Sequence, residues 1–339
     1  MKIDLRSDTF TKPTAPMLEA MFNAKVGDDV FSEDPTVNEL EHKTAALFGM
    51  EAALFCPSGT MTNQIAIKCH TEPGNEVICE KTSHVYIYEG GGIAFNSGCQ
   101  VSPIAGSRGK INAEQVLAAI NPDDVHKPQT TLVALENTAN RGGGSCYEWA
   151  ELVKIREVCT EHSLKFHLDG ARLWNALIAK NETPVQYGKL FDSISVCLSK
   201  GLGAPVGSLL LGNEDFIKKA RRYRKVFGGG MRQAGYMAAA GIYALDHNID
   251  RLQTDHSHAT LIATALQGNK YVKNIFPVET NIIIFETAND YPAAKFTEYL
   301  KLKNILAIPI APNQVRFVTH LDISEQMVSE IVKALHEME

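Results

Sequence analysis

The sequence predicts an α/β fold in which a large domain, built on a mostly parallel sheet of seven strands, is followed by a small C-terminal α/β domain. Short apolar runs alternate with helical or turn segments through most of the chain, which is typical of strands joined by crossovers in a sheet covered on both faces. From about Asp246 the pattern changes to a long helix, short strands and a last helix. The expected division is an N-terminal arm (residues 1–25), a large domain (26–245) and a small domain (246–339).

The first well-bracketed element is a helix that follows the extended N-terminal arm. Asp34 and Pro35 supply an N-cap and a first helical position, and Gly49 ends the helix. Between them lies an apolar stripe at helical spacing, made by Val37, Leu40, Leu47 and Phe48.

The strands of the large domain are predicted from short apolar runs. They are expected at residues 52–56, 76–79, 100–103, 131–135, 165–168, 193–198 and 207–211. Ligands collect at the carboxyl ends of the strands in such sheets, and most of the candidate residues below follow those ends.

The small domain is predicted to contain strands at residues 281–285, 306–308 and 315–318, closed by a helix over 324–336. Apolar groups fall on one face of that helix, which favours core packing over a partner-binding surface. They are Ile323, Val328, Ile331, Val332 and Leu335.

The composition argues for a cytoplasmic enzyme. The formal net charge is -6, and the densest basic cluster, residues 218–225, is expected to be a solvated helix face, so no nucleic-acid partner is predicted. No hydrophobic signal region begins the chain and no later stretch is apolar for long enough to span a bilayer. The seven cysteines form no Cys-x-x-Cys pair, which indicates reduced thiols.

Two residues after predicted strands point to a particular chemistry. Lys200, in Leu198-Ser199-Lys200-Gly201, is an amine among small residues at a strand end, where it can form a Schiff base. Asp169, in His167-Leu168-Asp169-Gly170, can hold a pyridine nitrogen protonated from a neighbouring strand end. Either residue alone reads more simply as a solvated lysine or a helix cap, but both demands together belong to pyridoxal 5'-phosphate (PLP).

A phosphate cup is expected at Ser58, Gly59 and Thr60, because small and hydroxyl residues stand there between a strand and a helix start. The plainer interpretation is a strand-to-helix turn. The glycine clusters elsewhere contain no complete Gly-x-Gly-x-x-Gly, which counts against a nicotinamide enzyme.

Three further side chains are candidates for the substrate side. Arg172 follows Asp169 closely and is placed for a two-pronged grip on an amino-acid carboxylate. Arg316 is a charge inside a strand-like run and could be a second carboxylate clamp. His84, after the strand at 76–79, could stack on a ring face, although a core or surface histidine is the simpler interpretation.

The chain resembles the threonine aldolases, in the β-eliminating lyase group of fold-type I PLP enzymes, nearly from end to end. The stretches that carry the resemblance are Asp4-Leu5-Arg6-Ser7-Asp8-Thr9, Glu33-Asp34-Pro35-Thr36, Pro57-Ser58-Gly59-Thr60, His167-Leu168-Asp169-Gly170-Ala171-Arg172, Cys197-Leu198-Ser199-Lys200-Gly201-Leu202-Gly203, Gly228-Gly229-Gly230-Met231-Arg232-Gln233 and Val315-Arg316-Phe317-Val318-Thr319-His320.

The resemblance implies a role for each matched residue. Lys200 would hold the cofactor as a Schiff base, Asp169 would pair with the pyridine nitrogen, and His84 would stack on the ring. Ser199 joins the cofactor-binding set. The carboxylate of the amino-acid substrate would be bound by Ser7, Arg172 and Arg316.

The resemblance also implies a homo-oligomer. Lys225 and Arg232 would reach the cofactor phosphate of a neighbouring subunit, so the active site would be built across a dimer, commonly within a tetramer. His126 matches a substrate-side histidine of the family. Two stretches depart from the family: Asn137-Thr138-Ala139-Asn140 lacks a frequent histidine, and Phe31 replaces a frequent tyrosine.

The expected reaction is retro-aldol cleavage of a β-hydroxy-α-amino acid, L-threonine or L-allo-threonine, to glycine and an aldehyde, with His84 and His126 both candidates for the base. A PLP β-lyase for aromatic amino acids, a PLP aminotransferase and an α/β binding module without catalysis are the alternatives. No metal site is predicted, since His256 and His258 form only a close pair that is expected to be solvated.

Overall fold

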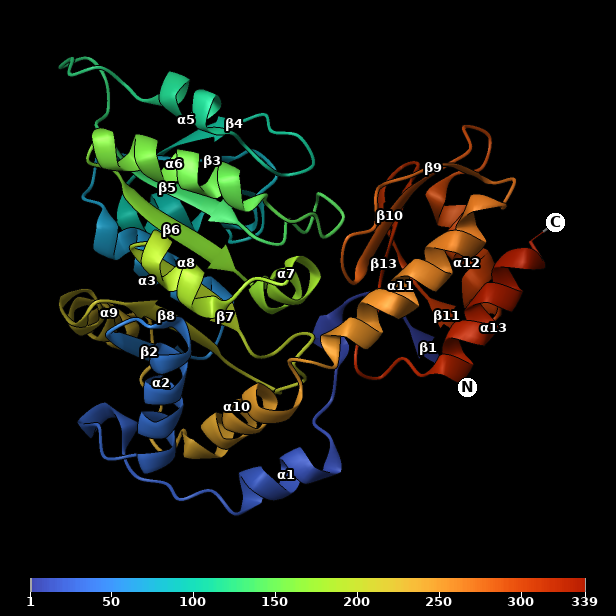
Figure 1. The fold of residues 1–339 in the computed structure, drawn as a ribbon, viewed down its shortest axis with the longest axis horizontal. Coiled ribbons are helices and arrows are strands. Elements are labelled where there is room, and N and C mark those ends of the chain that lie inside the picture. The colour runs from blue at the N-terminus through green and yellow to red at the C-terminus, as the bar shows by residue number, and fades with distance from the viewer. Residues whose placement is uncertain (1, 339) are drawn as a thin grey trace.

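A computed structural model gives the fold for residues 2–338 and confirms the predicted class (Figure 1). The seven strands of the large sheet lie in the spatial order β2-β8-β7-β6-β5-β3-β4, and all run parallel except β8, which is antiparallel to both neighbours. They are β2 (Ala52–Cys56), β3 (Glu76–Glu80), β4 (Gln100–Ile104), β5 (Thr130–Glu136), β6 (Lys165–Gly170), β7 (Ser193–Cys197) and β8 (Ser208–Gly212).

Helices cover both faces of this sheet because its strands are apolar on both sides. On β8, Leu209 and Leu211 pack toward one face while Leu210 packs toward the other. The Leu210 face is covered by α3 (Gly59–His70) and α9 (Glu214–Val226). The opposite face is covered by α2 (Pro35–Phe48), α5 (Ala113–Ala119), α6 (Trp149–Glu161), α7 (Leu173–Lys180), α8 (Pro184–Leu190) and α10 (Gly235–His247).

Helix α2 begins and ends as its sequence predicts. The Asp34 carboxylate caps it by accepting from the backbone N–H groups of Thr36 and Val37, and Gly49 ends it in the left-handed conformation.

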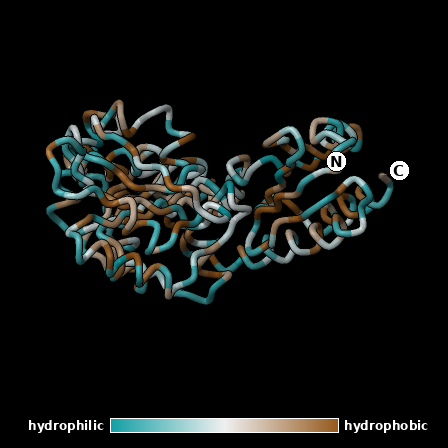
Figure 2. Tube along the Cα trace, turned by 90° about the horizontal axis from the view of Figure 1, so that it is seen from above, coloured by the Kyte–Doolittle hydropathy of each residue, from teal (hydrophilic) through white to brown (hydrophobic). Residues whose placement is uncertain are grey.

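The small domain is an antiparallel sheet covered by helices. Its strand order is β12-β13-β10-β9, with β12 (Ile308–Ala311), β13 (Gln314–Val318), β10 (Ile282–Thr287) and β9 (Val272–Ile275). The helices are α11 (Leu252–Gln267), α12 (Ala293–Leu302) and α13 (Glu325–His336). The apolar face of α13 packs into the core of this domain, as predicted. Figure 2 shows hydrophobic stretches inside both domains, which lie end to end.

The N-terminal segment contacts both domains. Its first strand, β1 (Ile3–Asp4), pairs in parallel with β11 (Ile305–Leu306), and Leu5 lies in the core of the small domain. The chain then returns to the large domain, where α1 (Ala15–Phe22) packs against α10. The region predicted as one extended arm therefore joins the two domains and contains a helix.

The basic cluster on α9 is not a wholly solvated face. Arg224 is 2% exposed, donates to the backbone oxygen of Phe55 at 2.7 Å, and forms an ion pair with Asp29 at 2.7 Å. The expectation failed because charges at helical spacing do not show which of them a distant carboxylate neutralises.

The prediction that His256 and His258 are solvated is wrong. Both are buried on α11, and the His256 Nε2 lies 3.2 Å from the amide nitrogen of Asn175 on α7. Burial lowers the pKa of His256 to about 4.

Among residues 2–338, no helix has the length and apolar character needed to cross a bilayer.

Buried His256 is expected to make the fold sensitive to acid. As the pH falls below 6.5 the unfolded chain takes up a proton at this position, whereas the folded chain takes it up only near pH 4, so stability is lost over that window. Urea unfolding at several pH values should show a decline between pH 6.5 and 4 that is smaller in His256→Gln, by on the order of 2 kcal/mol. The control is His162→Gln, at an exposed histidine. An identical decline in the His256 variant and the wild type would contradict this.

Candidate active site

The carboxyl edge of the large sheet brings most of the predicted site residues around one cavity of about 150 Å³, called here the central cavity. It is lined by Ser58, Gly59, Thr60, Asn63, His84, Asp169, Ala171, Cys197, Ser199 and Lys200. The residues come from the carboxyl ends of β2, β3, β6 and β7 and from the connections that follow them, and these four strands all point the same way. A doubly wound sheet therefore explains why residues far apart in sequence meet here.

Lys200 follows β7 and presents its amine to the central cavity. The Nζ donates to the Sγ of Cys197 at 3.3 Å, and the hydroxyl of Thr11 donates to the backbone oxygen of Lys200 at 3.0 Å. The N-terminal segment thus fixes the backbone that carries this amine.

Asp169 lies near the end of β6 and is 2% exposed. One of its oxygens accepts from the amide of Asn63 at 2.9 Å, and the other accepts from the backbone N–H of Ala171 at 3.1 Å. Asn63 is oriented in turn by the ring of His167, whose Nε2 lies 3.2 Å from the amide oxygen. The carboxylate is therefore held in one orientation, with its charge directed to the central cavity.

The predicted phosphate cup is the N-terminus of α3. Ser58 caps this helix by accepting from the N–H of Met61 at 3.2 Å, while the first N–H groups of the helix have no partner within it. A side chain on Gly59 would come within 2.7 Å of the Sγ of Cys197, so glycine lets the helix start approach β7 closely. Free N–H groups and the helix dipole make this end of the cavity suitable for an anion.

His84 begins the short helix α4 (His84–Ile87) and has a buried partner that the sequence did not reveal. Its Nδ1 lies 2.8 Å from the Oε1 of Glu89, a carboxylate that also accepts from Asn63 at 2.9 Å and from Gln64 at 2.6 Å. Burial alone would lower the pKa of His84, but the bond to Glu89 and the charge of Asp169 raise it.

His84, Glu89 and Asp169 lie close enough together to resemble a metal-binding group. Asn63 donates from one amide nitrogen to both carboxylates, so hydrogen bonding already accounts for this arrangement. Hydrogen bonds thus connect the His84 imidazole to Glu89, and the Asn63 amide connects Glu89 to the carboxylate of Asp169 on β6.

The guanidinium group of Arg172 binds a carboxylate of the same chain. Its Nε and Nη2 donate to the two carboxylate oxygens of Asp8 at 2.8 and 2.6 Å, and both side chains are buried. Burial would raise the pKa of Asp8, yet the charge and hydrogen bonds of Arg172 lower it to about 2. The two-pronged grip predicted for Arg172 is therefore made to Asp8, which leaves only its remaining N–H groups for another anion.

Arg316 reaches the site from β13 of the small domain. Its Nη1 donates to the side-chain oxygen of Asn140 at 2.7 Å, and its Nη2 donates to the backbone oxygen of Arg6 at 3.0 Å. Its Nε is buried and, among residues 2–338, has no hydrogen-bond partner. Burial and the charge of Arg172 lower the pKa of Arg316 to about 10, so an anion between the two arginines would relieve an electrostatic cost.

Ser7 stands in the chain between Arg6, whose backbone oxygen accepts from Arg316, and Asp8, which accepts from Arg172, and it is 8% exposed. Its hydroxyl caps the short 3₁₀ helix Asp8–Phe10, accepting from the N–H of Thr9 at 3.2 Å. Its position is set by the same segment that supplies Asp8 and the backbone oxygen of Arg6.

Six predicted residues do not line the central cavity of this chain: Ser7, Arg172 and Arg316, described above, and His126, Lys225 and Arg232. His126 lies in the loop between α5 and β5, where its side chain is 86% exposed and contacts Asp124 at 2.8 Å. Lys225 lines a separate basic hollow of about 450 Å³, and Arg232 pairs with Asp28 at 2.9 Å. The basic hollow is formed by Val30, Lys218, Arg221, Arg222, Arg224, Lys225 and Gly230.

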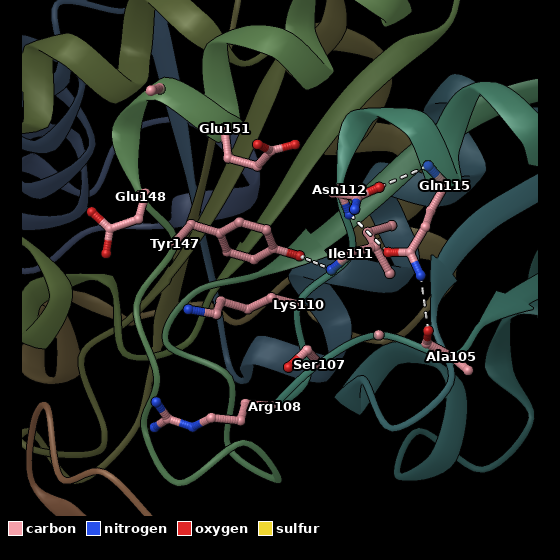
Figure 3. Close-up of a pocket in the computed structure, with 12 residues that line it drawn as sticks. Ala105, Ser107, Arg108, Lys110, Ile111, Asn112, Gln115, Tyr147, Glu148 and Glu151 are labelled. Carbon is pink, nitrogen blue, oxygen red and sulfur yellow. Dashed lines mark hydrogen bonds between the residues drawn. The ribbon is translucent and has the colours of Figure 1, made fainter.

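A larger hollow, of about 580 Å³, lies between the loop after β4 and the start of α6 (Figure 3). Its polar groups support local structure: the N–H of Ile111 donates to the hydroxyl of Tyr147 at 3.0 Å, and Asn112 and Gln115 cap α5. None of the predicted site residues lines it. Size alone therefore does not identify the active site.

Comparison with known proteins agrees with this geometry. The family described as "Beta-eliminating lyase" matches residues 4–290. The chain belongs to the beta-eliminating lyase family. The predicted resemblance and the lyase class are thereby confirmed.

Similar members of the family have names that specify an activity. The low specificity L-threonine aldolase of Escherichia coli K12 is 45% identical over 97% of each chain. The enzyme of the same name from Saccharomyces cerevisiae is 39% identical over 98% of this chain and 86% of its own length. The solved structure of Leishmania major threonine aldolase covers 99% of both chains with a TM-score of 0.86 at 21% identity, which supports the fold.

Proposed function

We propose that this chain cleaves β-hydroxy-α-amino acids, L-threonine and L-allo-threonine, to glycine and an aldehyde, with PLP as its cofactor. The observation that carries the proposal is the central cavity, where the Lys200 amine, the Asp169 carboxylate and the free N-terminus of α3 lie together. The names of relatives that share 39–45% identity over nearly the whole chain support the same substrate class.

The donor set fits PLP because it offers one group for each part of that molecule. Lys200 would hold the aldehyde carbon, Asp169 the ring nitrogen, and the α3 start with Ser199 the phosphate. When bound, PLP supplies an electron sink that makes breaking a bond to the substrate Cα feasible. The protein would supply a buried carboxylate that keeps the ring positive and an amine whose backbone is held in place by Thr11.

The arginines bind and orient the substrate. The unpartnered Nε of Arg316 and the N–H groups of Arg172 that Asp8 leaves free are suited to the α-carboxylate, beside Ser7. A carboxylate held between the two domains fixes which bond to Cα stands ready to break. Phe31, which replaces a tyrosine frequent in the family, has an exposed side chain and does not line the central cavity.

His84 is the better placed of the two candidate bases. If its Nδ1 carries the proton that Glu89 accepts, its Nε2 is free to take the proton of the β-hydroxyl group, directly or through water. Breaking the Cα–Cβ bond then releases the aldehyde, and a proton returned to Cα gives glycine. The side chain of His126 is exposed and lies outside the central cavity, so in this chain it does not line the place where the β-hydroxyl group would bind.

The basic hollow supports a shared active site. Lys225 lines it beside Lys218 and Arg222, and among residues 2–338 none of these three forms an ion pair, so this surface carries excess positive charge that the cofactor phosphate bound by a second copy of the chain would neutralise. We propose a dimer in which Lys225 and Arg232 complete the neighbour's phosphate site, assembled further into a tetramer.

The proposed activity is tested by incubating the purified, PLP-loaded protein with L-threonine, L-allo-threonine and D-threonine and measuring acetaldehyde and glycine. We expect equal amounts of the two products from both L-amino acids and none from the D-isomer. Formation of an oxo acid and pyridoxamine phosphate would instead indicate an aminotransferase. A colourless protein with no spectral response to PLP would indicate a non-catalytic module.

A further inference from the structure

Glu136 is a buried carboxylate at the end of β5, directly beside Asp169 in the sheet. Its Oε2 accepts from the backbone N–H of His84 at 2.7 Å, and its Oε1 accepts from the backbone N–H of Asn140 at 2.8 Å. The two donors belong to two different connections, one after β3 and one after β5. Among residues 2–338, no lysine or arginine forms an ion pair with it.

Each of the two backbone segments that Glu136 binds carries a group of the proposed substrate site. The ring of His84 lines the central cavity, and the side-chain oxygen of Asn140 accepts from Arg316 at 2.7 Å. One carboxylate thus connects the imidazole on one side of the substrate with the guanidinium on the other, in the second case through Asn140.

The position is an unfavourable one for a negative charge. Burial, and after it the charge of Asp169, raise the pKa of Glu136 to about 7. A glutamine would carry no charge, but it has a single acceptor oxygen and would turn its NH₂ group toward one of the two N–H donors. What a carboxylate adds is therefore a second acceptor, which lets one side chain bind both segments at once.

We propose that Glu136 is a positioning residue for the reaction: it sets the place of His84 directly and of Arg316 through Asn140. This inference rests on the proposed function, in which Arg316 binds the α-carboxylate and His84 faces the β-hydroxyl group. Glu136 itself lines no part of the central cavity and acts only through these two partners.

The test compares Glu136→Gln with Glu76→Gln in the PLP-loaded protein. Glu76 is also a buried β-strand carboxylate, at the opposite edge of the sheet, where it accepts from Asn121, Thr130 and Gln100. For Glu136→Gln we expect an increase of about 5-fold in KM for L-threonine and a decrease of about 10-fold in kcat, because the NH₂ group of glutamine repels one of the two N–H donors and the side chain can no longer hold both segments in place together. Glu76→Gln should change neither constant, although it should lower the thermal midpoint.

Glycine binding gives a second measurement that needs no turnover. Calorimetry should show a dissociation constant for glycine about 5-fold higher in Glu136→Gln and unchanged in Glu76→Gln. Asn140→Ala breaks the path to Arg316, so adding Glu136→Gln to it should weaken glycine binding no further. Additive effects of the two substitutions, or equal behaviour of Glu136→Gln and Glu76→Gln, would overturn the inference.

If Glu136→Gln does not fold, Glu136→Asp replaces it in the test. Aspartate keeps the carboxylate, but its side chain is too short to reach both N–H groups. Wild-type glycine affinity in that variant would also overturn the inference. A wild-type protein that binds glycine but cleaves no hydroxy amino acid would contradict the proposed function alone, and the glycine comparison would still decide the role of Glu136.

Discussion

Lys200→Ala is expected to abolish the absorbance band of the lysine-bound cofactor and to reduce aldehyde release by about 10⁴-fold or more, since no neighbouring amine can take over a covalent role. Within the central cavity, Lys200 is the one amine among the lining residues. The measurement is an absorbance spectrum after PLP addition, followed by an acetaldehyde assay.

The matched control for that change is Lys219→Ala, which removes a lysine of α9 whose amine donates to the backbone oxygen of Cys69. It should keep the spectrum and the rate of the wild type. Retention of both the band and the turnover in Lys200→Ala would remove Lys200 from the mechanism.

Asp169→Asn is expected to lower kcat by about 10²- to 10³-fold, because a neutral amide cannot stabilise a positive ring nitrogen in a buried site. The size of the side chain is unchanged, and Lys200 remains available, so the protein should still bind PLP. Steady-state kinetics with L-allo-threonine, together with a titration of PLP binding, would separate these two effects.

Asp192→Asn is the corresponding control. Asp192 lies just before β7, at the opposite edge of the same sheet, where it pairs with Arg156 at 2.6 Å and accepts from the N–H of Phe166. It is expected to reduce stability but not kcat. A similar loss of kcat in both variants would mean that Asp169 acts through the fold and not through charge at the ring.

Much of the large domain could be predicted because a strand buried on both faces is a continuous apolar run. The run at 52–56 coincides with β2, and that at 193–198 covers β7. In contrast, β9 was missed, since its central residues Lys273 and Asn274 are exposed and polar. Likewise β1 is two residues long and depends on a partner some 300 positions away in the chain.

The site residues that could be predicted are those whose chemistry is visible in one short motif, such as Lys200 and Asp169. The missed ones act through partners that only the fold supplies. Glu89 looks like any acidic residue near a glycine turn, and nothing in the sequence shows that it meets His84. Asp8 stands in one of the stretches that carry the resemblance, but its ion pair with Arg172 joins residues 164 positions apart, and the sequence does not show that contact.

The placement of the first strand has a consequence for the candidate active site. Residues 3–11 form β1, carry the Thr11 hydroxyl that donates to the backbone oxygen of Lys200, and place Asp8 on Arg172. A bulky group attached to this segment, or its removal, would disturb the docking of β1 and, with it, the backbone that carries Lys200.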